Sequence, residues 1–191
     1  MAIYHFSAKV ISRAAGSSAV ASAAYRSAER LHDQRLDRHH DFTNKSGVVH
    51  NEVLLPEGAP ERFGDRATLW NEVEATELRK DAQLCREVEF AIPREMSQHQ
   101  GIELARDFVQ SEFVDRGMIA DLNVHWDIGG DGEAKPHVHV IKHPFASPTL
   151  SYRFSSLANL MSVTDARARP LCHSDGTDLA EKNRPRSFCQ I

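Results

Sequence analysis

The chain has 191 residues, of which 41% are hydrophobic and 26% charged, which fits a soluble globular protein with room for one good-sized core. Its apolar runs are far shorter than the roughly 20 residues that cross a bilayer, so we expect no membrane insertion. The first residues lack the basic stretch and apolar segment of a signal peptide, and three cysteines without CxxC spacing fit a reducing compartment. We therefore expect a cytoplasmic protein.

The formal net charge of −4 is unevenly distributed along the chain. Residues 1–50 carry seven Lys or Arg against four Asp or Glu, together with five histidines, whereas residues 51–140 carry nine against 19. Two interpretations stay open: a phosphate-facing surface near the N-terminus, or ordinary fluctuation of a solvated surface. Charge alone does not decide between nucleic-acid binding and other functions.

The first third of the chain predicts a strand, a helix and a second strand. Residues 3–11 alternate loosely and contain aromatic and β-branched residues, which favours a strand. Residues 19–31 are rich in alanine and follow Gly16-Ser17-Ser18, which breaks the chain and offers an N-cap, so they predict a helix. Residues 44–47 predict a turn between two short strand-like pieces, of which the second is 48–55.

Two longer helices are predicted in the middle of the chain. Residues 61–82 predict a helix, residues 86–92 a short strand that Pro93 ends, and residues 98–116 an amphipathic helix that Gly117 stops. The first of these helices has four apolar positions: Leu69, Trp70, Val73 and Leu78.

A β-hairpin follows the helices. Residues 118–127 and 136–141 predict two strands, with Gly-rich residues 129–132 as the turn between them. Long helices between hairpin-connected strands indicate an α+β fold, an antiparallel sheet with packed helices. We expect a functional domain over 1–141 and an atypical C-terminal tail over 142–191 with little order, because the tail is polar and has weak periodicity.

Three histidines converge in this hairpin. Residues two apart on a strand share a face, so His137 and His139 project side by side, and the hairpin can bring His125 opposite them. Three neutral imidazoles would hold a divalent ion and leave positions open for water or a phosphate oxygen. The alternative is a pair of solvent-facing histidines and an unrelated third.

Tyr25 lies on a small and polar face of the predicted helix 19–31. Its neighbours at helical spacing are short or polar, so a bulky ligand such as a DNA backbone could approach the phenol. The alternative is a partly buried tyrosine that packs its ring.

Several carboxylates could assist a metal. Glu87 and Glu89 share one face of a short strand, and either could orient a ligand or act as a general base. Asp127 lies two residues from His125 on the same strand face, so it could orient a metal-binding histidine. Three further glutamates have the spacing of a solvated helix face: Glu72, Glu74 and Glu77.

Several motifs resemble the MobA/MobL relaxases, including the TraA-type conjugative relaxases, in the family's order over residues 1 to about 140. They are the opening MAIYHFSAK, the stretch Ser22-Ala23-Ala24-Tyr25-Arg26, Leu69-Trp70-Asn71, Glu77-Leu78-Arg79-Lys80, Arg86-Glu87 running to Ile92-Pro93, and His125 followed by Pro136-His137-Val138-His139.

The resemblance implies an HUH-type relaxase fold, with Tyr25 as the nucleophile, His125, His137 and His139 as ligands of Mg or Mn, and Glu87 as a helper near the metal. It implies nicking and rejoining of one DNA strand at a plasmid transfer origin through a 5′-phosphotyrosine. Single-stranded DNA is the expected partner, with accessory mobilisation proteins and a secretion-system coupling protein. From charge, we expect four arginines to contact the DNA: Arg13, Arg26, Arg30 and Arg35.

The chain departs from the family pattern after the histidine pair. The apolar strand ending and the Trp-containing helix of the family are missing after residue 141, and no Trp follows Trp126. A frameshifted or truncated remnant with impaired activity would explain the departure. Two other functions therefore stay open: a catalytically defective remnant that only binds the origin, and a metal-dependent phosphodiesterase that uses water.

Overall fold

The structure is a computed structural model that describes residues 5–130 and 132–144. The predicted tail from residue 145 onward lies outside the described residues, and so do the first residues of the predicted strand 3–11. The hypothesis that an altered tail impairs activity therefore stays a prediction.

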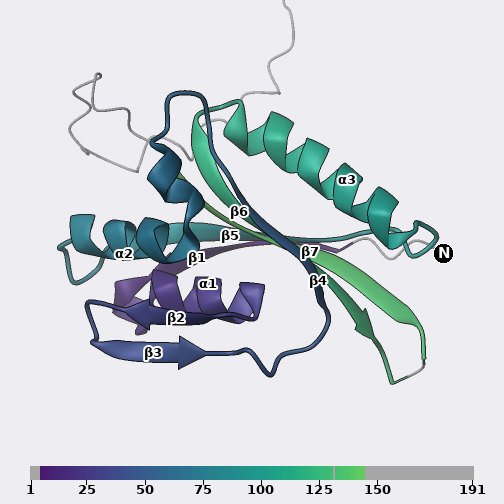
Figure 1. The fold of residues 1–191 in the computed structure, drawn as a ribbon, viewed down its shortest axis with the longest axis horizontal. Helices are drawn as coiled ribbons and strands as arrows, with labels where there is room; N and C mark the ends of the chain where they lie inside the picture. The colour runs from purple at the N-terminus through teal and green to yellow at the C-terminus, as the bar shows by residue number, and fades with distance from the viewer. Residues whose placement is uncertain (1–4, 131, 145–191) are drawn as a thin grey trace, which may run out of the picture. The chain divides into compact units, whose positions relative to one another are not determined.

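Five strands form one antiparallel sheet, which confirms the predicted α+β fold (Figure 1). The order across the sheet is β1-β5-β7-β6-β4, and every neighbouring pair is antiparallel. The strands are β1 (Phe6–Ser12), β4 (Val48–Leu54), β5 (Gln83–Ala91), β6 (Met118–Ile128) and β7 (Ala134–Pro144).

Helices cover both faces of this sheet (Figure 1). Helices α1 (Ala19–Ser27) and α2 (Arg66–Thr76) pack on one face over a buried apolar cluster, and α3 (Gln98–Val109) packs on the other over a second cluster. Short helical turns complete the helical part: η1 (Arg13–Ala15), η2 (Glu61–Gly64) and the π-turn η3 (Gln110–Val114). No helix in the described part of the chain has the length and apolar character needed to span a bilayer.

Successive side chains of β7 point to opposite faces of the sheet. Val138 and Val140 belong to the cluster under α3, whereas Ile141 belongs to the cluster under α1 and α2. His137 and His139 share the parity of Ile141, so they lie on the face that carries α1. The same parity on the neighbouring strands brings further polar side chains to this face: Asp121, Asn123 and His125 on β6, and Glu87 and Glu89 on β5.

Asp121 anchors α2 to this face of the sheet. Its carboxylate is fully buried and accepts hydrogen bonds from Arg66 Nε at 2.9 Å, Arg66 Nη2 at 3.0 Å and the Trp70 indole at 2.8 Å. A buried carboxylate is tolerated when it is paired and hydrogen-bonded in this way. The network fixes α2, which in turn packs against α1.

The predicted helix 19–31 is too long by four residues. α1 ends at Ser27 because Ala28 adopts a left-handed conformation with φ of 57°, and its N–H caps the helix on the Ala24 carbonyl. The chain then enters a separate two-stranded ribbon, β2 (Arg30–Asp33) and β3 (Arg38–Asp41). The sequence predicted a short strand-like piece before the turn 44–47, where β3 lies, but predicted neither β2 nor the pairing of the two strands.

Other helix and strand boundaries also differ from the predicted ones. The predicted helix 61–82 is a short turn followed by α2, which begins after the N-cap Asp65 and ends at Thr76. Leu78, predicted as a buried apolar position, is 86% exposed. The helix predicted over 98–116 ends as α3 at Val109 and continues as η3. β7 runs to Pro144, so the strand extends beyond the predicted domain boundary at residue 141.

Candidate active site

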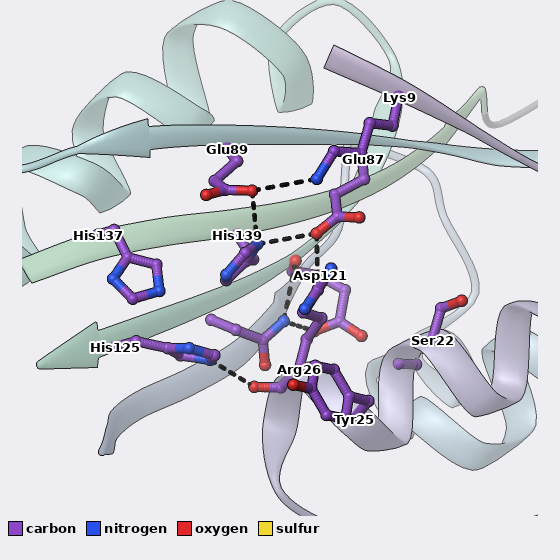
Figure 2. A network of polar contacts seen from close by, with 12 residues as sticks. Lys9, Ser22, Tyr25, Arg26, Glu87, Glu89, Asp121, His125, His137 and His139 are labelled. Atoms are coloured by element: carbon purple, nitrogen blue, oxygen red, sulfur yellow. Dashed lines mark hydrogen bonds and ion pairs between the residues drawn. The ribbon is translucent and has the colours of Figure 1, made fainter. Parts of the chain in front are cut away.

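The β6–β7 hairpin brings the three predicted histidines together (Figure 2). The register pairs His125 directly with His137, and His139 is the next residue on that face of β7. The ring centroids form a nearly equilateral triangle with separations of 5.1, 4.8 and 5.1 Å. One ring nitrogen from each histidine lies within 4.8 Å of the others, so the three could share one ion.

Each imidazole is oriented by a hydrogen bond from one of its nitrogens. His125 Nε2 donates to the Arg26 carbonyl at 2.7 Å, His137 Nδ1 to the Lys135 carbonyl at 2.9 Å, and His139 Nδ1 to Glu87 Oε1 at 2.8 Å. Carbonyl and carboxylate oxygens only accept, so these contacts fix the tautomer of each ring. The second nitrogen of each ring keeps its lone pair for a metal.

Burial keeps two of these rings, His125 and His139, in the neutral form that binds metals. His125 is 1% exposed, and burial, with smaller contributions from the charges of Lys45 and the other two histidines, lowers its pKa to about 4. Burial also lowers the pKa of His139, against the opposing effect of its hydrogen bond to Glu87. Neither ring needs to lose a proton near neutral pH before it can bind an ion.

Glu87 is buried between Arg26 and His139. Burial by itself would raise the pKa of Glu87, but hydrogen bonds from His139 and from Arg26 Nε, the latter at 2.6 Å, outweigh it and lower the pKa to about 2. A carboxylate that binds a proton so weakly is a poor general base near neutral pH. Of the two roles that the sequence left open, the geometry favours orientation of His139 over proton abstraction.

Tyr25 lies near the C-terminal end of α1 and is linked to the histidines through its neighbour Arg26. The Arg26 backbone carbonyl accepts a hydrogen bond from His125, and the Arg26 guanidinium binds Glu87 (Figure 2). The backbone and the side chain of Arg26 therefore both hold α1 against the site. The Tyr25 side chain is 43% exposed, but its ring is not free of apolar contact. Phe42 packs edge-on against it with ring centroids 5.2 Å apart, so the ring is packed on one side, as in the alternative that the sequence left open.

The four predicted DNA-contacting arginines separate into two groups. Arg26 belongs to the site, and Arg30 lies on the exposed ribbon, 3.9 Å from Asp41. Arg13 and Arg35 instead pair with Glu74 at 2.7 and 2.9 Å.

Glu74 is buried, contrary to the predicted solvated helix face. Its Oε1 also accepts a hydrogen bond from the backbone N–H of Ala19 at 2.8 Å. Arg13 and Arg35 therefore help to hold the start of α1 in place.

Asp127, which the sequence predicted as a neighbour of His125 that could orient a metal-binding histidine, lies beside His137 instead. Its Oδ2 is 3.9 Å from His137 Nε2, the nitrogen that remains available for a metal. A hollow of about 570 Å³ opens at the same place, with Ala91, Ile92 and Pro136 among its apolar lining residues. Its polar and ionisable lining residues are His5, Glu89, Arg94, Asp127, Lys135 and His137.

Lys45 is the site residue that sequence reasoning missed. It lies in the turn 44–47, and its Nζ donates to the Tyr25 carbonyl at 3.2 Å and lies 4.2 Å from the centroid of the Tyr25 ring. A single lysine in a turn carries no periodic signal, and its contact with Tyr25 depends on how the β2–β3 ribbon returns to α1.

Comparisons with known proteins identify the family of this chain. The sequence profile of the MobA/MobL family matches residues 17–143. "Conjugal transfer protein TraA" of Agrobacterium fabrum is 41% identical over 74% of the chain, and "Mobilization protein MobL" of Acidithiobacillus ferridurans is 45% identical over 65%. The chain spans 13% and 32% of the lengths of these two relatives.

A solved structure also superimposes on this chain. It is described as "Molecular Basis of Vancomycin Resistance Transfer in Staphylococcus aureus", and it matches with a TM-score of 0.68 and 39% identity over 74% of this chain and 70% of that one. At 39% sequence identity, the similarity indicates common ancestry and not only a shared fold. By sequence profile, relatives and structure, this chain belongs to the MobA/MobL family.

Proposed function

We propose that this chain nicks and rejoins one DNA strand at a plasmid transfer origin, with Tyr25 as the nucleophile. The observation that carries the proposal is the position of Arg26, which joins the tyrosine helix to His125 through its carbonyl and to Glu87 through its guanidinium. A nucleophile and three converging imidazoles are thereby held on one face of the sheet. The names of the relatives, conjugal transfer and mobilisation proteins, support the same biological role.

We infer that His125, His137 and His139 hold a divalent ion, Mg or Mn. The residues fit such an ion because each ring has one nitrogen oriented by a hydrogen bond and a second one available. Of the two metals, Mn²⁺ suits the nitrogen ligands better, since Mg²⁺ strongly prefers oxygen. When bound, the ion would supply positive charge to a non-bridging oxygen of the scissile phosphate.

The covalent step is a transesterification. The phenol oxygen of Tyr25 forms a bond to phosphorus, and the bond from phosphorus to the 3′ oxygen of the preceding nucleotide breaks. The phenol proton is lost and the leaving oxygen takes up a proton, which yields a 3′-hydroxyl and a 5′-phosphotyrosine. The reverse attack by a 3′-hydroxyl reseals the strand without ATP, because the new phosphodiester keeps the energy of the broken one.

The bound DNA would be single-stranded near the nick. Arg30 and the hollow beside His137, which Arg94 helps to line, form the proposed path. Arg26, whose guanidinium is paired with Glu87, contributes by holding Tyr25 in place. Accessory mobilisation proteins and a secretion-system coupling protein are the further partners that we propose. Arg13 and Arg35 are removed from this path because both are engaged with Glu74.

A covalent-adduct assay tests the reaction. The protein is incubated with Mn²⁺ and an origin oligonucleotide labelled on the 3′ side of the nick, and the products are separated on a denaturing gel. We expect a protein-linked DNA band in the wild type and none in Tyr25→Phe, which keeps the ring against Phe42 but lacks the nucleophilic oxygen. Cleavage that persists in Tyr25→Phe would indicate a phosphodiesterase that uses water, and binding without any product would indicate an origin-binding remnant.

A further inference from the structure

Lys45 contacts Tyr25 at two points. Its Nζ donates to the Tyr25 backbone carbonyl at 3.2 Å, and the same nitrogen lies over the face of the ring, 4.2 Å from the centroid. An ammonium group has three N–H donors, so one hydrogen bond leaves donors for another acceptor. The cation thus holds the tyrosine and can still bind a ligand.

The turn that carries Lys45 is fixed to the sheet beside the histidines. The Lys45 backbone N–H donates to the Phe42 carbonyl at 2.9 Å, and Trp126, the residue after His125, donates its backbone N–H to the Gly47 carbonyl at 2.7 Å. Gly47 has a φ of +91°, and a Cβ there would come within 1.9 Å of an Asp127 carboxylate oxygen. The Asp127 carboxylate ends a half-exposed side chain that could move aside, so it is the positive φ that favours glycine at this position.

The positive charge of Lys45 beside Tyr25 has no paired carboxylate among the described residues, and this favours an anionic ligand. Arg26 also approaches the ring, with Cζ 5.0 Å from the centroid, but its charge is neutralised by Glu87 at 2.6 Å. Lys45 forms no such ion pair with any carboxylate in the described part of the chain. Burial, with a further contribution from Arg26, lowers the pKa of Lys45, while Asp127 and Glu87 act against this shift. A half-buried cation without a paired carboxylate gains most from an anion that arrives with the substrate.

We propose that Lys45 is a positioning and charge-stabilising residue for the nicking reaction, one that holds the Tyr25 phenol and offers its ammonium to the incoming DNA phosphate. This proposal rests on the proposed function of Tyr25. The favourable charge interaction strengthens as negative charge develops on the phenol oxygen and the phosphate, so its main effect is on the rate of reaction.

The test compares Lys45→Gln with wild type in single-turnover nicking at saturating origin oligonucleotide and Mn²⁺. Gln keeps a hydrogen-bond donor for the Tyr25 carbonyl but removes the charge. We expect the rate constant for adduct formation to fall about 100-fold, the loss typical of one electrostatic stabiliser, with a change in DNA Kd of less than about fivefold. Lys45→Arg restores the charge and should recover most of the rate. Lys80→Gln, at an exposed position between α2 and β5, is the matched control.

The outcomes separate the two proposals. No adduct in the wild type would overturn the proposed function and this inference with it. A wild-type adduct with an unchanged rate in Lys45→Gln would overturn the role of Lys45 alone, and so would a slow Lys45→Gln whose rate Lys45→Arg fails to raise. If thermal melting shows that Lys45→Gln is unfolded, Lys45→Met, which retains the apolar stem, takes its place under the same criteria.

Discussion

Glu87 shows how one buried side chain serves two partners. It accepts from His139, which orients one ring of the histidine cluster, and from Arg26, which holds the helix that carries Tyr25. The same two donors lower the pKa of Glu87 to about 2 against the effect of burial, so the carboxylate stays ionised and in place at any ordinary pH. Its contribution to the proposed reaction is therefore indirect, through the rings and the helix that it fixes.

Replacement of Glu87 by Gln should weaken metal binding. The amide still accepts one hydrogen bond but loses its charge, so His139 is less firmly oriented and Arg26 loses its ion pair. We expect Mn²⁺ affinity to fall about 10-fold to 100-fold, the range for loss of a ligand-orienting partner, and the nicking rate to fall more than DNA affinity. Isothermal calorimetry with Mn²⁺ measures the first effect. Glu103→Gln, at an exposed position on α3, should leave affinity unchanged, and an equal loss in both variants would contradict the role of Glu87.

At the scale of elements, α1 is held at both ends by residues from elsewhere in the chain. At its beginning, Glu74 on α2 accepts from the Ala19 N–H and pairs with Arg13 and Arg35. At its end, Arg26 bonds His125 on β6. A helix of nine residues would be marginal alone, so its position depends on these contacts and on packing.

Replacement of Glu74 by Ala should destabilise the fold. Removal of the buried carboxylate leaves the Ala19 N–H without its acceptor and takes the ion-pair partner from Arg13 and Arg35, although Arg13 still donates to backbone carbonyls. We expect a loss of about 3 kcal/mol in the free energy of unfolding. Urea denaturation followed by circular dichroism measures it. Glu72→Ala is the matched control on the same helix, since its exposed pair with Arg62 at 3.6 Å contributes about 0.5 kcal/mol or less. Similar losses in both variants would show that Glu74 is not an anchor.

At the scale of the whole molecule, metal binding and folding should be coupled. The three histidines come from two adjacent strands at the centre of the sheet, so an ion bound there stabilises only the folded state. By mass action, Mn²⁺ at about 100 times its Kd adds about 2.7 kcal/mol of stability.

His137→Ala should remove this effect without unfolding the protein. His137 is the most exposed ligand of the three, with a side chain 23% exposed, so its truncation opens little space in the core. We expect the melting temperature of the wild type to rise with added Mn²⁺ and to fall back with EDTA, while the variant melts at one temperature in both conditions. Differential scanning fluorimetry makes the comparison, and an equal Mn²⁺ response in the variant would remove His137 from the ligand set.

Local sequence pattern predicted the sheet and the histidine cluster because strand alternation and hairpin pairing are short-range rules. Val138 and Val140 alternate with His137 and His139, and the pairing with His125 follows from the turn. The β2–β3 ribbon was predicted only in part: a strand-like piece was expected before the turn 44–47, whereas β2 is mostly polar and begins at Arg30, inside the predicted helix 19–31. The same limit applies to charged residues whose partners are distant in the chain: Glu74, Arg13, Arg35 and Lys45.

The strict alternation on β7 has a consequence for how the protein matures. A shift of one residue in the pairing of β6 with β7 would turn the imidazoles toward α3 and leave the valines facing α1. Such a misregistered chain would lose its apolar interior and its three-nitrogen cluster together. One register therefore sets both the burial of the apolar side chains and the assembly of the three imidazoles, so a chain that folds with its apolar interior intact has also brought the histidines together.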